Sequence, residues 1–168
     1  MKTITLILLI FAIWFASTQL GINWPRIMIA SPGTSQNPNS QPEQWRQLIS
    51  EPSIEEIEKL VLDKINDRRI ENNREPIEWS QHLAQKAREH STWMADTSEY
   101  QHSTYNCYEN CFWGVSISSY RLADTIVNTW MESKGHKANL LEAEITKCGI
   151  GIAFNPTTNS HYATFMAY

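Results

Sequence analysis

The C-terminal segment Lys147–Ala167, KCGIGIAFNPTTNSHYATFMA, contains two strand-like runs on either side of a short polar connection. The runs are Lys147–Phe154 and His161–Ala167, and the sequence NPTTN at Asn155–Asn159 separates them. Apolar, aromatic and β-branched residues favour strands, whereas Asn and Pro favour turns. This pattern predicts a β-hairpin at the end of the chain.

Helical signals precede this hairpin. Ser53-Ile54-Glu55-Glu56 matches a capping box, in which the first and last residues bond each other's backbone N–H groups. Apolar residues at helical spacing predict three helices. The first covers residues 54–69, the second runs from the cap Ser80 to about residue 95, and the third covers residues 119–134 and ends before Gly135. A further strand is expected over 112–117. Helices followed by a mixture of helices and strands predict an α+β fold or a three-layer sandwich.

The composition excludes several classes of protein. The chain has 168 residues, of which 42% are hydrophobic and 11% aromatic, and its formal net charge is −4. This length suits one domain, and this balance excludes a disordered chain, a collagen-like repeat and a polytopic membrane protein. With 14 Lys and Arg against 18 Asp and Glu, no basic excess is available to neutralise phosphates. We therefore expect no nucleic-acid partner.

The N-terminal 25 residues predict a membrane signal. Residues 3–25 carry no charge, and Ile4–Ala16 is almost continuously apolar between flanking basic residues. The nearest site for a signal peptidase, Ala16-Ser17-Thr18, is poor because it follows a bulky Trp-Phe pair. An uncleaved signal-anchor is therefore favoured over a cleaved signal peptide, and both place the rest of the chain outside the cytoplasm. A buried soluble helix is disfavoured because the segment lacks a polar face.

A spacer is expected over residues 26–52. Its part Ser31–Gln44 contains three Pro, one Gly and no aliphatic residue. Such a segment buries too little apolar surface to offset its ordering entropy. The folded domain is therefore expected over residues 53–168.

The five histidines are the candidate chemical groups. His82 is expected to be a solvated helix residue, and His90 a packed, hydrogen-bonded side chain rather than a ligand. His102, His136 and His161 lie in three separate segments, so their spacing alone does not bring them together. The sequence has no local metal motif such as H-E-x-x-H or paired C-x-x-C.

A series of motifs, taken in order, resembles the CAP superfamily, which comprises cysteine-rich secretory proteins, antigen 5 and pathogenesis-related 1 proteins and has an SCP-like extracellular domain. The segment Trp130–Leu141, WMESKGHKANLL, is similar to the prokaryotic pattern W-x-x-S-x-G-H-R-x-N-[IL]-L. The other similar segments are Ile57–Arg68, Ile77–Ala87, His102-Ser103, Glu109-Asn110, Cys148–Ala153 and His161–Phe165.

The resemblance implies an α-β-α sandwich with a cleft that holds two His and two acidic residues. In some members this cleft binds a divalent metal, often zinc. His102 matches the first family His, and Glu109 matches the Glu of the E-N motif.

Ser133 stands where animal and plant members have a second Glu, and Glu132 is one residue out of place. A helix turns about 100° per residue, so Glu132 should point elsewhere. His136 lies three residues after Ser133 and is expected to take that role. His161 occupies the place of the animal His before Tyr-Thr-Gln.

We therefore predict that His102, His136 and His161 bind a divalent metal, most simply Zn²⁺, with Glu109 as the fourth ligand or as the acceptor that fixes a His tautomer. The alternative is a metal-free polar network of these four residues. The expected cleft neighbours are Ser103, Asn110, Ser133 and Tyr162.

Three cysteines suit an exported chain with one disulfide and one spare thiol. Cys107 and Cys111 bracket Glu109 and lie too far apart in an extended segment to bond each other. A bridge to Cys148 is therefore expected, with Cys111 favoured over Cys107. Three reduced, buried thiols are the alternative, and a metal site at these cysteines is less favoured than either.

The resemblance implies binding of lipids, sterols or other proteins more than a general reaction. The prediction is an extracytoplasmic, non-enzymatic binding module, tethered to the membrane or secreted. The alternatives are a metal-dependent hydrolase of peptide or ester bonds at the cell envelope, with Glu109 as general base for a metal-bound water, and a structural surface protein.

Overall fold

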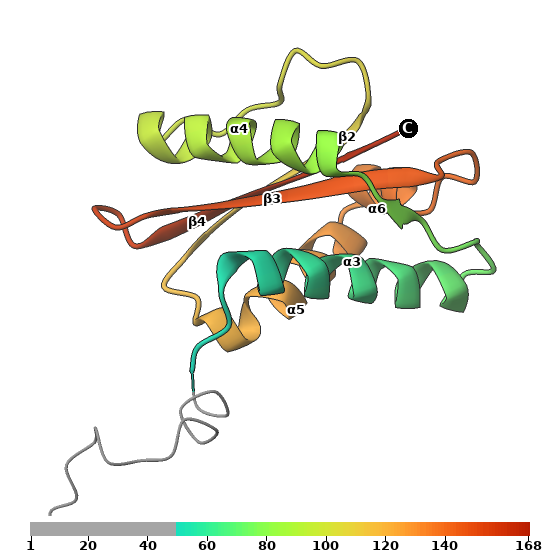
Figure 1. Ribbon diagram of the computed structural model, residues 1–168, viewed down its shortest axis with the longest axis horizontal. Coiled ribbons are helices and arrows are strands. Elements are labelled where there is room, and N and C mark those ends of the chain that lie inside the picture. The colour runs from blue at the N-terminus through green and yellow to red at the C-terminus, as the bar shows by residue number, and fades with distance from the viewer. Residues whose placement is uncertain (1–49) are drawn as a thin grey trace, which may run out of the picture. The chain divides into compact units, whose positions relative to one another are not determined.

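A mixed four-stranded sheet with the order β1-β3-β4-β2 carries the structure (Figure 1). The computed structural model describes residues 50–168. The strands are β1 (Glu78–Trp79), β2 (Tyr108–Val115), β3 (Lys147–Asn155) and β4 (Ser160–Ala167). The helices are α3 (Ile54–Glu71), α4 (Gln81–Thr97), α5 (Ser119–Glu132) and α6 (Lys134–Leu140).

The expected signal-anchor or signal peptide, with its hydrophobic helix, and most of the expected spacer lie outside the described residues. These stay predictions. Within residues 50–168, no helix combines the length and the apolar character needed to cross a membrane.

Local sequence signals set several element ends. The capping box of α3 is present, since Ser53 N donates to Glu56 Oε2 at 2.7 Å and Glu56 N donates to Ser53 Oγ at 3.3 Å. Ser80 caps α4 as predicted. The prediction for Gly135 was wrong, because Ser133 ends α5 and caps a new helix, α6, which contains Gly135. The Ser133 hydroxyl accepts from His136 N, so a cap replaces the expected stop.

The C-terminal hairpin is confirmed. Strands β3 and β4 pair antiparallel, and Asn155 Oδ1 accepts from Thr157 N at 2.9 Å in the connection. Strand β2 begins four residues earlier than predicted, because Tyr108 already pairs with Ala167 of β4. Glu109 is therefore held in a strand.

Two helical layers cover the sheet, with α4 on one face and α3 and α5 on the other (Figure 1). Helix α4 approaches β3 closely at two glycines. A Cβ atom on Gly149 would lie 2.0 Å from Ala84 N, and one on Gly151 would lie 2.0 Å from Arg88 N. The class is therefore α+β, in three layers.

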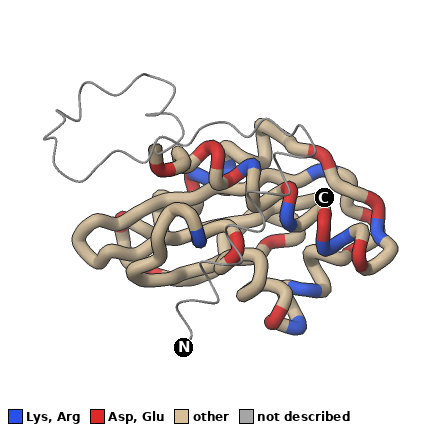
Figure 2. The backbone as a smooth tube through the Cα atoms, turned by 90° about the horizontal axis from the view of Figure 1, so that it is seen from below, with Lys and Arg blue, Asp and Glu red and all other residues tan. Residues whose placement is uncertain are grey.

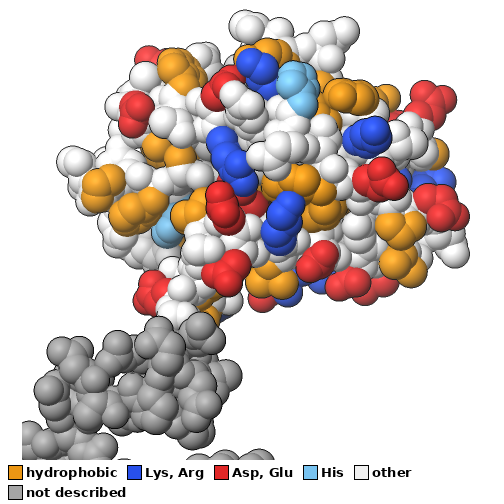
Figure 3. Space-filling view, in the orientation of Figure 1, with side chains coloured by type: hydrophobic (Ala, Val, Ile, Leu, Met, Phe, Trp, Pro, Cys, Tyr) orange, Lys and Arg blue, Asp and Glu red, His pale blue; other side chains and the backbone are white. Residues whose placement is uncertain are grey.

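The main core lies between the sheet and helices α3 and α5, where the Trp130 and Phe165 rings lie 6.2 Å apart. A smaller cluster of Leu83, Ala87 and Met166 packs under α4. The central strands β3 and β4 carry almost no charge, and the charged residues lie along helices and loops (Figure 2). On the face in Figure 3, positive and negative side chains are interspersed.

Candidate functional site

The carboxylate of Glu109 is the centre of the candidate site. Its side chain is 6% exposed and lies on β2, and three donors from the loop between α4 and β2 hold it. His102 Nδ1 lies 2.7 Å from Oε1, Ser103 N donates to Oε1 at 2.9 Å, and Ser103 Oγ donates to Oε2. The structure thus brings together His102, Ser103 and Glu109, three of the residues that the sequence singled out.

The protonation of this pair follows from its contacts. Burial alone would raise the pKa of Glu109, but the hydrogen bonds from Ser103 and His102 outweigh it and hold that pKa below its usual value. Glu109 is therefore ionised at neutral pH and only accepts, so His102 Nδ1 carries the proton. The His102 side chain itself is 63% exposed.

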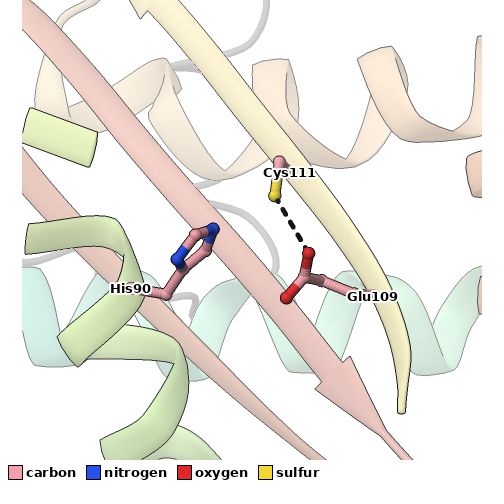
Figure 4. Close-up of side chains that lie close together, drawn as sticks. All are labelled: His90, Glu109 and Cys111. Atoms are coloured by element: carbon pink, nitrogen blue, oxygen red, sulfur yellow. Dashed lines mark hydrogen bonds between the residues drawn. The ribbon is translucent and has the colours of Figure 1, made fainter. Parts of the chain in front are cut away.

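Two further donors lie beside Glu109 on the α4 face of the sheet (Figure 4). They are His90 of α4 and Cys111 of β2, and all three residues are buried. Each of the three residues offers one ligand atom, and these three atoms all lie within 4.8 Å of one another. Cys111 Sγ lies 3.6 Å from Glu109 Oε1. Three types of metal ligand therefore converge at one point.

His90 is a packed and hydrogen-bonded side chain, as predicted. Its Nε2 lies 2.9 Å from the carbonyl oxygen of Gln101, and its ring stacks on Trp93 at 5.7 Å. Its proximity to Glu109 was missed, since residues 19 positions apart on different elements give no local signal. Cys111 offered a signal, because residues two apart on a strand share a face.

His136 lies near this site without joining the group of three. Burial lowers the pKa of His136, and the electrostatic interaction with His102 lowers it further. Within residues 50–168, its buried Nδ1 has no hydrogen-bond partner. Its carbonyl oxygen accepts from Asn110 Nδ2 at 3.0 Å, which ties α6 to β2. Ser133, an expected cleft neighbour, caps α6.

The structure does not bring His161 to Glu109. Met166 of β4 pairs with Glu109, and His161 lies five residues further along β4, opposite Gly114. At about 3.4 Å per residue the separation is roughly 17 Å. His161 also shares its face with Phe165, toward α3 and α5, so the four-residue metal set does not assemble.

Tyr162, the last expected cleft neighbour, points to the α4 face. It packs with Cys111, Met94 and Ala95 in a small buried cluster. Tyr162 therefore lies on the same face of the sheet as the site, where it packs against Cys111.

The predicted disulfide is absent, and Cys107, Cys111 and Cys148, all within the described residues, are free thiols. Strand β4 lies between Cys111 on β2 and Cys148 on β3, so their backbones are about 10 Å apart across the sheet, and the register offsets them by about 10 Å more along it. They also point to opposite faces, since Cys148 packs in the main core and Cys111 faces α4. A disulfide needs Cα atoms within about 7 Å, so the expectation for Cys111 was wrong.

Cys107 is no better placed for a bridge. Cys107 comes directly before β2, and its side chain packs against Leu83, Ala87 and Met166 under α4. It therefore faces away from Cys148 in the main core.

A surface pocket of about 420 Å³ borders this site. His90 and His102 line it, together with the aromatic rings of Trp93 and Tyr105. Apolar rings with a few polar groups are typical of sites for organic ligands. The lining residues are Glu89, His90, Trp93, Gln101, His102, Ser103, Thr104 and Tyr105.

The comparisons identify the family. The model of the cysteine-rich secretory protein family, CAP, matches residues 62–167, and the chain belongs to this family. The uncharacterised protein YkwD of Bacillus subtilis (strain 168) is 28% identical over 112 residues, which cover 59% of this chain and 43% of that protein. The chain thus spans less than half of that relative. The prokaryotic CAP resemblance is confirmed.

Solved structures share the fold at low identity. An outer surface protein from Borrelia burgdorferi has a TM-score of 0.55 at 16% identity, over 70% of this chain and 96% of that one. An extracellular SCP-domain protein from Bacillus anthracis has a TM-score of 0.51 at 20% identity, over 71% and 45%. NaASP2, solved with Zn²⁺, has a TM-score of 0.54 at 12% identity, over 71% and 82%.

Proposed function

We propose that this protein is a non-enzymatic binding module that works outside the cytoplasm and holds a divalent cation, with Zn²⁺ as the first candidate. The cation would lie at Glu109 between His90 and His102. The bordering pocket would take an organic ligand or a side chain of a protein partner. The observation that carries this proposal is the buried Glu109 carboxylate with imidazoles converging on it.

The donor chemistry fits zinc. Zn²⁺ prefers imidazole nitrogen, thiolate sulfur and carboxylate oxygen in a set of four. His102 Nδ1 lies 2.7 Å from Glu109 Oε1, so a cation that replaced the proton between these atoms would contact both of them. The related fold of NaASP2, solved with Zn²⁺, supports the same choice of metal.

The state of Glu109 favours binding over hydrolysis. A general base works best with a pKa near the pH of the reaction. The pKa of Glu109 is instead held below its usual value by its hydrogen bonds. Ser103 also donates to both carboxylate oxygens, which stabilises the charged form of Glu109 against protonation.

The extracytoplasmic location rests on the N-terminal sequence and on the relatives. Residues 1–25 predict a signal-anchor or signal peptide. The structural relatives include an extracellular protein of Bacillus anthracis and an outer surface protein of Borrelia burgdorferi. We therefore place the domain outside the membrane, tethered or secreted.

Calorimetric titration of Zn²⁺ into the purified full-length chain in mild detergent tests the cation site. We expect one Zn²⁺ per chain. His102→Gln should weaken binding by about 10-fold to 100-fold, because it removes an imidazole beside Glu109. His82→Gln is the matched control, since His82 is exposed on α4, and it should bind like wild type. No binding by wild type, or equal binding by His102→Gln, contradicts the proposal.

Turnover assays separate the module from a hydrolase. The full-length chain, with Zn²⁺ added, is incubated with a peptide library and an ester library. We expect no turnover. Hydrolysis that disappears in Glu109→Gln would replace the proposal with an envelope hydrolase.

A further inference from the structure

Cys111 lies on the buried side of the same site, with 2% of its surface exposed. Its Sγ lies 3.6 Å from Glu109 Oε1 and 3.9 Å from His102 Nδ1. His90 closes the group from α4 (Figure 4). Ligand atoms of Cys111, Glu109 and His90 thus lie within 4.8 Å of one another, and His102 Nδ1 lies beside the sulfur and the carboxylate.

We propose that Cys111 is a sulfur ligand of the cation. The site therefore takes a thiophilic cation, such as Zn²⁺, Cd²⁺ or Cu⁺, in preference to Mg²⁺ or Ca²⁺. This inference rests on the proposed function, because Glu109 and its imidazoles belong to both the cation site and the sulfur site. The donor set is His90, His102, Glu109 and Cys111. Sulfur ligands select soft cations, whereas Mg²⁺ and Ca²⁺ prefer oxygen.

The distances from Cys111 Sγ suit a tetrahedral ion. With bonds of about 2.0–2.3 Å, ligand atoms around tetrahedral Zn²⁺ lie about 3.3–3.8 Å apart. The separations of 3.6 Å and 3.9 Å from Sγ are in or close to this range. The Nδ1–Oε1 distance of 2.7 Å is shorter because a proton now lies between those atoms.

The protons at the site mark where the cation would sit. Glu109 Oε1 accepts from His102 Nδ1, from Ser103 N and from Cys111 Sγ, so three donors converge on one oxygen. A cation held by these atoms would replace the hydrogen atoms on Cys111 Sγ and His102 Nδ1. Because a thiol loses its proton when it binds a metal, binding would release that proton to solvent.

The Cys111 thiol has no competing covalent role among the described residues. Cys148 lies on the opposite face of the sheet. Cys107 is four residues away along an extended segment, about 13 Å. The carbonyl oxygen of Gln101 lies between the thiol and the His90 imidazole. It is 3.6 Å from Cys111 Sγ and 2.9 Å from His90 Nε2.

Titration of Cd²⁺ into the reduced full-length chain, followed by ultraviolet absorption, tests the sulfur ligand. Cadmium bound to thiolate gives a sulfur-to-metal charge-transfer band that nitrogen and oxygen ligands do not give. We expect this band to saturate at one Cd²⁺ per chain and to persist in excess Mg²⁺. Cys111→Ser should lose it.

Two further variants keep the test decisive. Cys107→Ser, the matched control on the same face of the sheet, should keep the full band. His90→Gln should keep the band but require more Cd²⁺ to reach saturation. Circular dichroism checks that each variant is folded.

The outcomes separate the two proposals. A wild-type chain that binds Zn²⁺ in calorimetry without a Cd²⁺ charge-transfer band overturns the sulfur ligand and leaves the cation site standing. A band that survives in Cys111→Ser, or disappears in Cys107→Ser, also overturns it. A wild-type chain that binds neither Zn²⁺ nor Cd²⁺ overturns both.

Discussion

Asn139 Nδ2 donates a hydrogen bond of 3.0 Å to the backbone carbonyl oxygen of Glu109. The same amide donates to Asn110 Oδ1 at 2.9 Å, so one side chain of α6 holds two successive residues of β2. The Asn of the G-H-x-x-N motif therefore fixes the strand that carries the site carboxylate. It acts on the site through the backbone.

Replacing Asn139 should loosen this attachment. Asn139→Ala leaves two part-buried acceptors without their donor, which costs about 1–3 kcal/mol in free energy of unfolding. Urea denaturation followed by circular dichroism measures the loss. Asn128→Ala, on the exposed face of α5, is the control and should change stability by less than about 0.5 kcal/mol. Equal effects of the two substitutions would contradict this role.

The two glycines of β3 should tolerate no side chain. Gly151→Ala puts a Cβ atom 2.0 Å from Arg88 N, and backbone atoms cannot yield as a side chain does. We expect a loss of about 3 kcal/mol in urea denaturation. Gly135→Ala is the opposite case, since no atom lies within 4 Å of its Cβ position and it lies in α6. It should raise stability by about 0.5 kcal/mol.

The buried carboxylate of Glu58 should contribute strongly to the free energy of unfolding. It accepts from Arg88 Nε at 2.9 Å and from the backbone N–H of Ile152 at 3.1 Å, and so joins α3, α4 and β3. Glu58→Ala should cost about 3 kcal/mol, because it leaves a buried N–H and a guanidinium without their acceptor. Asp124→Ala removes the exposed ion pair with Lys64 and should cost less than about 1 kcal/mol. Thermal denaturation compares the two.

Acid should weaken the fold through His161. Burial lowers the pKa of His161 below its ordinary value of 6.5, and its ring lies 4.7 Å from that of Phe154. As the pH falls below 6.5, the unfolded chain takes up the proton first. The free energy of unfolding therefore decreases until the pH has passed the lower, folded-state pKa.

Urea midpoints between about pH 7.5 and pH 5 measure this dependence. His161→Gln should make the slope shallower, because it removes one of the buried imidazoles. The exposed control His82→Gln should keep the wild-type slope. An unchanged slope in His161→Gln would assign the acid sensitivity to other groups.

Short-range patterns in the sequence determined much of the fold. The start of α3 was predictable because Ser53 and Glu56 satisfy each other across three residues. The hairpin of β3 and β4 was predictable because the side chain of Asn155 bonds the backbone two residues on. The motif order also identified the family and singled out His102 and Glu109 as candidate site residues. Each of these features depends on neighbours along the chain or on a pattern of residue types.

Tertiary structure alone decided which donors meet at Glu109. The order of β3, β4 and β2 separates Cys111 from Cys148 and places His161 at the far end of β4, on the other face. The packing of α4 on the sheet brings His90 to Cys111. Strand order and register follow from which apolar faces are buried together across the whole chain, and a shift by one residue reverses every side chain. No local spacing contains that choice.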